Sequence, residues 1–447
     1  MLFSSNVFLF VFLPAVLGVY YLCPRRWRNP VLLGFSLLFY GWGEPVYLFL
    51  MIGVIVLDYF CGLWIGRQLD GAQSGKLPLT LGIAANLLIL GFFKYSALLL
   101  GRTLVPLPIG ISFYIFQSMS YLIDIYRHQA PVQRNVLTFG TYVTLFPQLI
   151  AGPIVRYTDV ASQLRQRREN LEQFSAGVET FVVGLSKKML LANPLGSLWV
   201  QLQGQSGAPA AWVGLAAYTL QIYFDFSGYS DMAIGLGRMF GFEFLENFNY
   251  PYISASITEF WRRWHISLST WFREYVYIPL GGNRRGLPRQ IGNMLVVWLL
   301  TGLWHGASWN FLLWGGYYAL LLILEKCFLL KLLARLPRAV GRVYAMASVM
   351  LGWALFYFED FGALVAFLRQ LFSWTGSPEA AGLIVGYLPL MALGVFAAGP
   401  WGKNLRNRHR DSALLRAGLM AAGAAALLLC TAALVRQSYN PFIYFRF

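Results

Sequence analysis

Runs of apolar residues follow one another along most of the chain. A helix needs about 20 predominantly apolar residues to cross the roughly 30 Å hydrocarbon layer of a membrane. Runs of comparable length occupy residues 7–22, 31–50, 46–65, 77–100, 107–125, 136–154, 174–195, 210–242, 291–324, 343–358, 383–398 and 414–435. The pattern predicts an all-α polytopic membrane protein with about 10 to 12 transmembrane helices.

Proline and glycine interrupt several of these runs, most clearly at residues 106–110 and 147–153. Broken backbone at membrane depth persists only where it is buried in protein or lines a cavity. We therefore expect one or two re-entrant segments besides the spanning helices. Because no period of about 20 to 50 residues repeats and no linker separates two soluble halves, we expect a single membrane domain over residues 1–447.

The composition agrees with a membrane location. Apolar residues make up 57% of the chain and charged residues only 12%, whereas soluble domains contain about 25% charged residues. The net charge is +16, from 35 Lys and Arg against 19 Asp and Glu, and the basic residues lie between the apolar runs. This distribution argues against nucleic acid binding and favours membrane lipids and anionic soluble ligands as partners. The four cysteines have no paired spacing, so we expect neither a disulfide framework nor a metal site.

The order of charges predicts the orientation of a multi-pass membrane protein. Run 7–22 has no Lys or Arg before it and three arginines just after it, within residues 25–28. This is the reverse of a cleavable secretory signal, so we expect an uncleaved first span with its amino end outside. The basic clusters at 331–342 and 403–416 should also be cytosolic. Since only run 414–435 follows the last cluster, both termini should be extracytoplasmic.

His305 lies near the middle of run 291–324, which contains no Asp, Glu, Lys or Arg. This run is too long for one upright span, so we expect His305 to lie at membrane depth, with the preceding Trp304 as a candidate substrate-binding residue. A neutral imidazole there can take a proton from a hydroxyl or thiol and return it, as a general base does. A histidine that only forms hydrogen bonds between helices is the structural alternative.

A second histidine, His265, belongs to a segment rich in tryptophan and arginine. Apolar residues at 261, 264, 268, 271 and 275 repeat every three or four positions, which predicts one amphipathic helix. Arg262 and Arg263 point mostly away from its apolar face, and His265 lies at the edge of that face. An interfacial anchor without chemistry explains the tryptophans and arginines about equally well.

The following loop, residues 279–286, combines glycines with Arg284 and Arg285. These two arginines could form a cytosolic mouth for a phosphorylated ligand. The other basic residues that could contribute to the mouth are Arg262, Arg263, Arg289, Lys187 and Lys188. Arginines that only retain the loop on the cytosolic side are the alternative.

Two further polar residues, Gln221 and Asp225, share one helix face within run 210–242. Asp225 could orient an imidazole or pair with an arginine, and a purely structural buried ion pair is equally open. The aromatic tail, residues 437–447, is too apolar to remain in water and too short to span a membrane. We expect it to dock into an aromatic cavity and hold the Tyr444 hydroxyl there, or to act as an interfacial anchor.

Taken in order, these motifs resemble the membrane-bound O-acyltransferase family, and within it the branch that acetylates alginate. The motifs are FSSN at 3–6, FPQLIAGP at 146–153, DFSGYSD at 225–231, WRRWHISL at 261–268, GLWHG at 302–306 and FIYFRF at 442–447. The resemblance implies tilted helices around a pinched tunnel, with His305 as the catalytic histidine and His265 as a second active-site residue. His265 would orient His305 or donate toward the developing oxyanion.

In a related branch that moves D-alanine onto teichoic acids, a separate small protein ends in a motif like residues 442–447, and its tyrosine is proposed to carry the acyl group. In this chain the motif is fused. The resemblance thus implies that acetyl-CoA binds from the cytosol as a co-substrate, with no permanently bound cofactor. Acetyl would pass to Tyr444 with His305 as base, and then to an extracytoplasmic SGNH-like acetyltransferase or another exopolysaccharide acetylation protein. The tail would enter the tunnel from outside.

Alternatives remain open. Within the family, acetyl could pass directly to a lipid or sugar hydroxyl in the tunnel, with Tyr444 only as a plug, or the acyl group could be D-alanyl. In a different class, a proton-coupled transporter of an anionic metabolite could use His265, His305 and Asp225 as a proton path. The sequence does not identify the acceptor polysaccharide.

Overall fold

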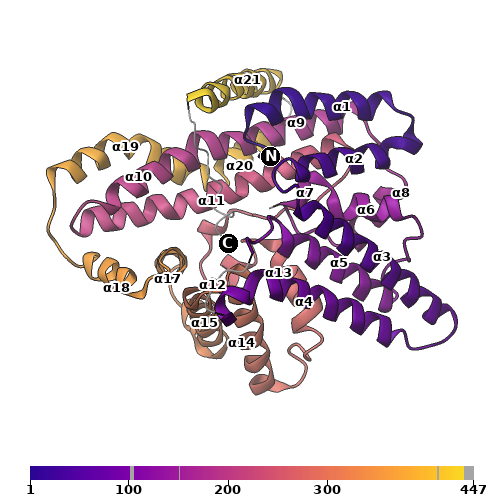
Figure 1. Ribbon diagram of the computed structural model, residues 1–447. Helices are drawn as coiled ribbons and strands as arrows, with labels where there is room; N and C mark the ends of the chain where they lie inside the picture. Colours follow the sequence, from indigo (N-terminus) through magenta and orange to yellow (C-terminus); the bar gives the residue numbers. More distant parts are fainter. Residues whose placement is uncertain (101–104, 151, 410–411, 437–447) are drawn as a thin grey trace. The chain divides into compact units, whose positions relative to one another are not determined.

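The computed structural model describes residues 1–100, 105–150, 152–409 and 412–436, with side chains from 97 to 100 excepted, and every regular element in these ranges is a helix (Figure 1). The chain forms two compact units. Unit 1 comprises residues 1–183 and 229–246, and unit 2 comprises residues 184–228 and 247–447. A single domain over residues 1–447 requires that the two units pack against each other. This expectation stays a prediction.

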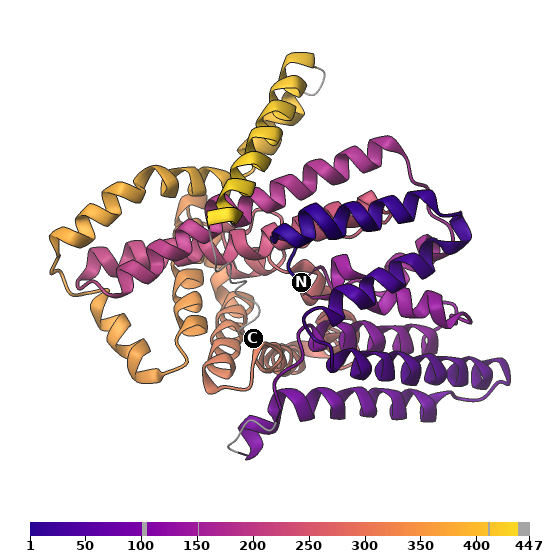
Figure 2. The ribbon, with the colours of Figure 1, turned by 45° about the horizontal axis from the view of Figure 1, so that its top comes forward.

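Unit 1 contains the amino-terminal helices, of which α3, α4 and α5 pack side by side (Figure 1 and Figure 2). Its elements are η1 (Phe8–Phe12), α1 (Leu13–Leu22), η2 (Arg25–Trp27), α2 (Arg28–Gly41), α3 (Tyr47–Asp70), α4 (Lys76–Leu100), α5 (Ile111–Tyr126), α6 (Val136–Thr144), α7 (Phe146–Leu149), α8 (Tyr157–Arg165), most of α9 (Leu171–Ser186) and the end of α11 (Ala208–Met239).

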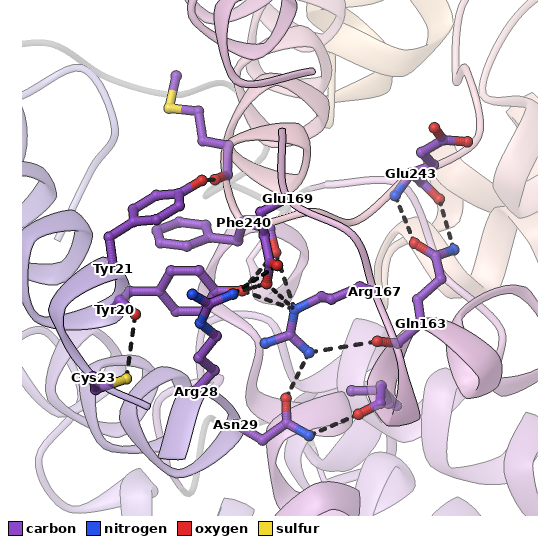
Figure 3. A network of polar contacts seen from close by, with 12 residues as sticks. Tyr20, Tyr21, Cys23, Arg28, Asn29, Gln163, Arg167, Glu169, Phe240 and Glu243 are labelled. Atoms are coloured by element: carbon purple, nitrogen blue, oxygen red, sulfur yellow. Dashed lines mark hydrogen bonds and ion pairs between the residues drawn. The ribbon is translucent and has the colours of Figure 1, made fainter. Parts of the chain in front are cut away.

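A polar network joins the ends of several helices of unit 1 (Figure 3). Glu169 forms an ion pair with Arg28 at 2.6 Å and lies 2.7 Å from the Tyr20 hydroxyl. The Arg167 guanidinium donates to Asn29 Oδ1 at 2.7 Å. Burial raises the pKa of Glu169, but hydrogen bonds from Tyr20 and Arg28 outweigh this effect and hold the pKa below its ordinary value. With Glu169 charged, this cluster holds the loop between α8 and α9 in place.

Unit 2 contains both candidate histidines. Its elements are η3 (Lys187–Ala192), α10 (Asn193–Gln203), most of α11, η4 (Pro251–Ile253), α12 (Ile257–Trp261), α13 (Ile266–Phe272), η5 (Arg273–Tyr277), α14 (Gly286–His305), α15 (Trp309–Leu324), η6 (Glu325–Leu329), α16 (Leu330–Leu333), α17 (Arg338–Tyr357), α18 (Phe361–Gln370), α19 (Pro378–Ala397), α20 (Trp401–Arg408) and α21 (Ala413–Arg436).

Within the described ranges, five helices are long and apolar enough to cross a membrane. They are Tyr47–Asp70, Lys76–Ser96, Arg338–Tyr357, Pro378–Ala397 and Ala413–Arg436. Two shorter apolar helical stretches, Phe8–Leu22 and Phe361–Gln370, also occur in these ranges. The expected count of about 10 to 12 crossings and the tunnel therefore stay predictions.

Two interruptions lie at or next to the prolines and glycines that predicted them, and a third lies in run 291–324. Gly110 precedes α5 with a φ of 76°, a conformation that glycine adopts without the strain a side chain would cause. The run 136–154 breaks at Leu145, between α6 and α7. The run 291–324 splits directly after His305 into α14 and α15. The third break produces the candidate site.

Candidate functional site

The α14–α15 hairpin positions His305 (Figure 1). A Cβ atom at Gly302 of α14 would collide with the carbonyl oxygen of Phe311, and one at Gly315 of α15 would collide with that of Trp298. These glycines allow the two helices to approach closely over their last and first turns. The turn between the helices, residues 306–308, is therefore held tightly against them.

His305 is the last residue of α14, and only 5% of its surface is exposed. Aromatic rings surround the imidazole. The centroid distances are 4.9 Å to Trp304, 5.0 Å to Trp314, 5.1 Å to Phe356 and 6.3 Å to Phe311. A neutral imidazole in this position can accept a proton.

The segment around His265 is not the single amphipathic helix that the spacing of its aromatic residues predicted. Helix α12 ends at Trp261, and α13 begins at Ile266. His265 lies between them with a φ of 45° and a ψ of 54°, in the left-handed region. Phe260 of α12 and Leu268 and Trp271 of α13 are buried, so apolar residues face the protein on both sides of the break.

Asn247 explains this break. Its backbone carbonyl accepts from the Ile266 amide at 3.0 Å, and its Oδ1 accepts from the amide and the hydroxyl of Ser267 at 3.1 and 2.9 Å. His265 Nδ1 lies 3.2 Å from the same Oδ1. Since this oxygen accepts from two other donors, we assign the His265 proton to Nδ1, which leaves the lone pair on Nε2.

His265 is 1% exposed and lies outside the five helices that can span a membrane. Burial lowers the pKa of its imidazole, so the ring is neutral at pH 7. Phe226 of α11 packs edge to face on it at 4.7 Å. The fixed tautomer and the buried ring are typical of an oriented functional histidine, although the same contacts also stabilise the turn.

Trp304 brings the two histidines into one site. Its ring lies 5.9 Å from the His265 ring and 4.9 Å from the His305 ring, both in edge-to-face geometry. Trp304 is itself 5% exposed. The sequence predicted all three residues as candidates, and the structure collects them in unit 2 from two segments about 40 residues apart.

The sequence analysis missed Glu325, a carboxylate with 1% exposure at the start of η6. It accepts from the backbone amides of Ile257 and Thr258 at 2.6 and 2.8 Å, and from the Thr258 hydroxyl at 2.6 Å. It thus caps the first turn of α12, the helix that leads to His265. A lone acidic residue after the apolar run 291–324 was the available signal. For Asn247 the sequence offered only its position between two predicted helical segments.

The other polar candidates have structural partners. Asp225 forms a buried ion pair with Lys188 at 2.5 Å. Lys188 is 3% exposed, so it does not belong to a solvated basic mouth. The side chain of Gln221 packs on Gly196 of α10, where a Cβ atom would collide with it. These contacts tie α10 and η3 to α11.

The arginines divide into two groups. Arg263 pairs with Glu259 at 3.0 Å and donates to the Asn249 carbonyl at 3.1 Å, so its charge is engaged within the protein. Arg262, Arg284 and Arg285 are exposed. The last two lie in the glycine loop that Asn293 of α14 anchors by a 2.9 Å hydrogen bond to the Gly282 carbonyl. Tyr444 and the whole tail 437–447 lie outside the described residues.

Comparison with known proteins gives consistent matches. The family model described as MBOAT, membrane-bound O-acyltransferase family, matches residues 127–359, which include both histidines. The chain is 41% identical to a probable alginate O-acetylase AlgI of Azotobacter vinelandii over the full length of both proteins. It is 32% identical to a peptidoglycan O-acetyltransferase of Helicobacter pylori, over 84% of this chain and 80% of that protein. It is 27% identical to a teichoic acid D-alanyltransferase of Bacillus subtilis, over 48% of this chain and 58% of that protein.

Proposed function

The chain belongs to the membrane-bound O-acyltransferase family and is a multi-pass membrane enzyme, and we propose that it acetylates an exopolysaccharide. It takes acetyl from cytosolic acetyl-CoA and passes it across the bacterial inner membrane. The full-length relatives named for alginate acetylation support acetyl as the group and a polysaccharide as the final acceptor. The match to a D-alanyltransferase covers only about half of the chain, so D-alanyl transfer is the weaker alternative.

The observation that carries the proposal is the pair of buried histidines against Trp304. A phenol with an ordinary pKa of about 10 is a poor nucleophile at neutral pH and needs a base within hydrogen-bond reach. In the proposed reaction, His305 takes the phenolic proton of Tyr444 while the oxygen attacks the thioester carbonyl. The C–S bond then breaks, and the imidazolium returns the proton to the departing thiolate. The products are acetyl-Tyr444 and free CoA.

His265 supports this reaction as an oriented second imidazole. Asn247 accepts the proton on its Nδ1, so Nε2 is the nitrogen that would exchange a proton with the reacting groups. The exposed Arg262, Arg284 and Arg285 are suited to the phosphates of acetyl-CoA, because guanidinium groups bind phosphate in two-pronged geometry. Arg263 is less suited, since Glu259 already neutralises it.

An acetyl ester of a phenol is a reactive donor, because phenoxide is a better leaving group than an alkoxide. The acetyl group can therefore pass to a serine of an extracytoplasmic SGNH-like acetyltransferase or to the polysaccharide itself. Both termini would then be extracytoplasmic. Direct transfer to a hydroxyl in the tunnel, with Tyr444 as a plug, would use the same His305 base. A proton-coupled transporter would use neither a thioester nor a tyrosine.

Turnover of acetyl-CoA by the purified protein in lipid nanodiscs tests the proposal. We expect CoA release that depends on an added acceptor and falls roughly 10²- to 10⁴-fold in His305→Ala, the usual contribution of a general base. His409→Ala, at an exposed histidine after α20, is the matched control and should retain full turnover. Full activity of His305→Ala would refute the catalytic assignment, and absence of turnover in the wild type with any acyl-CoA would favour the transporter.

A further inference from the structure

A cavity of about 330 Å³ lies in unit 2, bounded by α11, α17, α19 and the start of α20. Its volume is at the lower end of the range for small-molecule sites. The wall is almost entirely apolar, and Leu220, Met346, Met350, Met391, Val395 and Trp401 supply most of it. Flexible methionine side chains adapt to ligands of irregular shape, such as alkyl chains.

The two hydroxyl groups in the wall are engaged within the protein. Thr219 Oγ1 donates to the Leu215 carbonyl at 2.7 Å, and the Tyr252 hydroxyl donates to the Thr219 carbonyl at 2.5 Å. Neither hydroxyl therefore presents a donor that would select a polar ligand. The cavity thus fits a hydrocarbon chain better than a sugar or a nucleotide.

Two of the bounding helices, α17 and α19, are among the five that can span a membrane. On α17 the cavity contacts the middle of the helix, at Met346 and Met350, and on α19 it contacts the second half, at Met391 and Val395. Basic residues precede Met346 on α17 and follow the end of α19. Arg342 lies one turn before Met346, and α20 begins four residues after the end of α19. Along α19 the cavity therefore lies toward the end that leads into the basic residues of α20.

Helix α20 adds three exposed basic residues, Lys403, Arg406 and Arg408, directly beyond Trp401. At a rise of about 1.5 Å per residue, all three lie within roughly 11 Å of Trp401 along the helix axis. Basic clusters next to cavities between membrane helices are typical binding sites for anionic lipid head groups. The apolar cavity thus suits the acyl chain of an anionic lipid, and the basic residues suit its head group.

We propose that this cavity binds an anionic phospholipid, with one acyl chain between α11, α17 and α19 and the phosphate at the basic residues of α20. The bound lipid fastens α19 and α20 to the rest of unit 2. It belongs to the leaflet on the basic side, which the charge distribution predicts to be cytosolic. This site is separate from the histidines and is independent of which acyl group the enzyme transfers.

Native mass spectrometry of the full-length protein with phosphatidylglycerol or phosphatidylcholine tests this site. We expect one phosphatidylglycerol to be retained preferentially. Each basic residue near a membrane surface contributes roughly a fivefold gain in binding. Arg406→Gln/Arg408→Gln should therefore weaken retention about 25-fold. The matched control, Arg25→Gln/Arg26→Gln, removes two exposed arginines of unit 1 and should retain the lipid.

A second variant, Ala216→Phe, fills the cavity and leaves every charge in place. It should also lose the retained phosphatidylglycerol, and soluble glycerol phosphate should not compete with the lipid. If Ala216→Phe retained the lipid, or if glycerol phosphate displaced it, the binding would be surface adsorption of phosphate and the proposal would be wrong. Equal retention of both lipids by the wild type would also overturn it. If Ala216→Phe does not fold, Arg406→Gln/Arg408→Gln still tests the proposal, because both arginines are exposed.

Discussion

Replacing Asn247 with alanine removes the group that holds His265 in place. The Asn247 Oδ1 accepts from two groups of Ser267 and lies within hydrogen-bond distance of His265 Nδ1. Asn249, two residues later, is exposed, and only its backbone forms hydrogen bonds. Asn249→Ala is therefore a matched control that removes the same amide from the same loop.

The expected loss of stability follows from the donors left behind. The Ser267 hydroxyl can rotate to another acceptor, but its buried backbone amide and the His265 Nδ1 proton cannot. A buried donor without an acceptor costs about 1 to 3 kcal/mol, so Asn247→Ala should lower the free energy of unfolding by about 2 to 5 kcal/mol. Because the imidazole also loses its fixed tautomer and orientation, acetyl transfer should fall roughly 100-fold, as it does for small displacements of reacting groups.

Two readouts separate positioning from general destabilisation. Acetyl-CoA turnover is measured below the unfolding temperature of the variant, so that loss of folded protein does not contribute. The ¹⁵N spectrum of histidine-labelled protein reports the tautomer, and only four histidines are present in the chain. We expect the His265 signals to change from the Nδ1-protonated form in Asn247→Ala and to stay unchanged in Asn249→Ala. If both variants kept wild-type turnover and His265 tautomer, the assigned role of Asn247 would be refuted.

Three further predictions concern packing and charge. Gly315→Ala should destabilise the α14–α15 hairpin by about 2 kcal/mol or more, since its Cβ collides with backbone, whereas Gly316→Ala should be tolerated because nothing lies within 4 Å; thermal unfolding distinguishes them. Lys188→Met should cost about 3 to 5 kcal/mol by leaving Asp225 without its lysine, and adding Asp225→Leu should recover most of it in denaturant unfolding. Glu169→Gln should be less stable than the wild type at pH 7. The pKa of Glu169 is lower in the folded state, so the charged carboxylate stabilises the fold at pH values above its ordinary pKa of 4.5. The difference in the free energy of unfolding between the two proteins should vanish as the pH is lowered.

The sequence predicted those features that depend on local chemistry. The family was predicted from the ordered motifs and is confirmed by the full-length relatives. The length of run 291–324 showed that it exceeds one upright span and that His305 lies near its middle, but the break directly after His305 was not predicted. His265, His305 and Trp304 were selected as polar or amphipathic residues in apolar surroundings, and the structure places them together.

Features that depend on distant partners were not predictable. The single helix expected across residues 261–275 was wrong, because Asn247, 18 residues before His265, supplies the hydrogen bonds that stabilise the left-handed turn. The partner of Asp225 could not be chosen from sequence, since Lys188 lies 37 residues away in a π-helical turn. The helix cap from Glu325 likewise joins residues 67 and 68 positions apart. Spacing rules describe one helix and carry no information about such contacts.

The most direct test of the central claim is the mass of the carboxyl-terminal peptide after a single exposure to acetyl-CoA without an acceptor. The account predicts that Tyr444 gains one acetyl group in the wild type and in His409→Ala, but not in His305→Ala or Tyr444→Phe. An unmodified tail in wild-type protein that still transfers acetyl to an added acceptor would contradict the relay. An acetylated Tyr444 that forms equally fast in His305→Ala would contradict the assignment of the base.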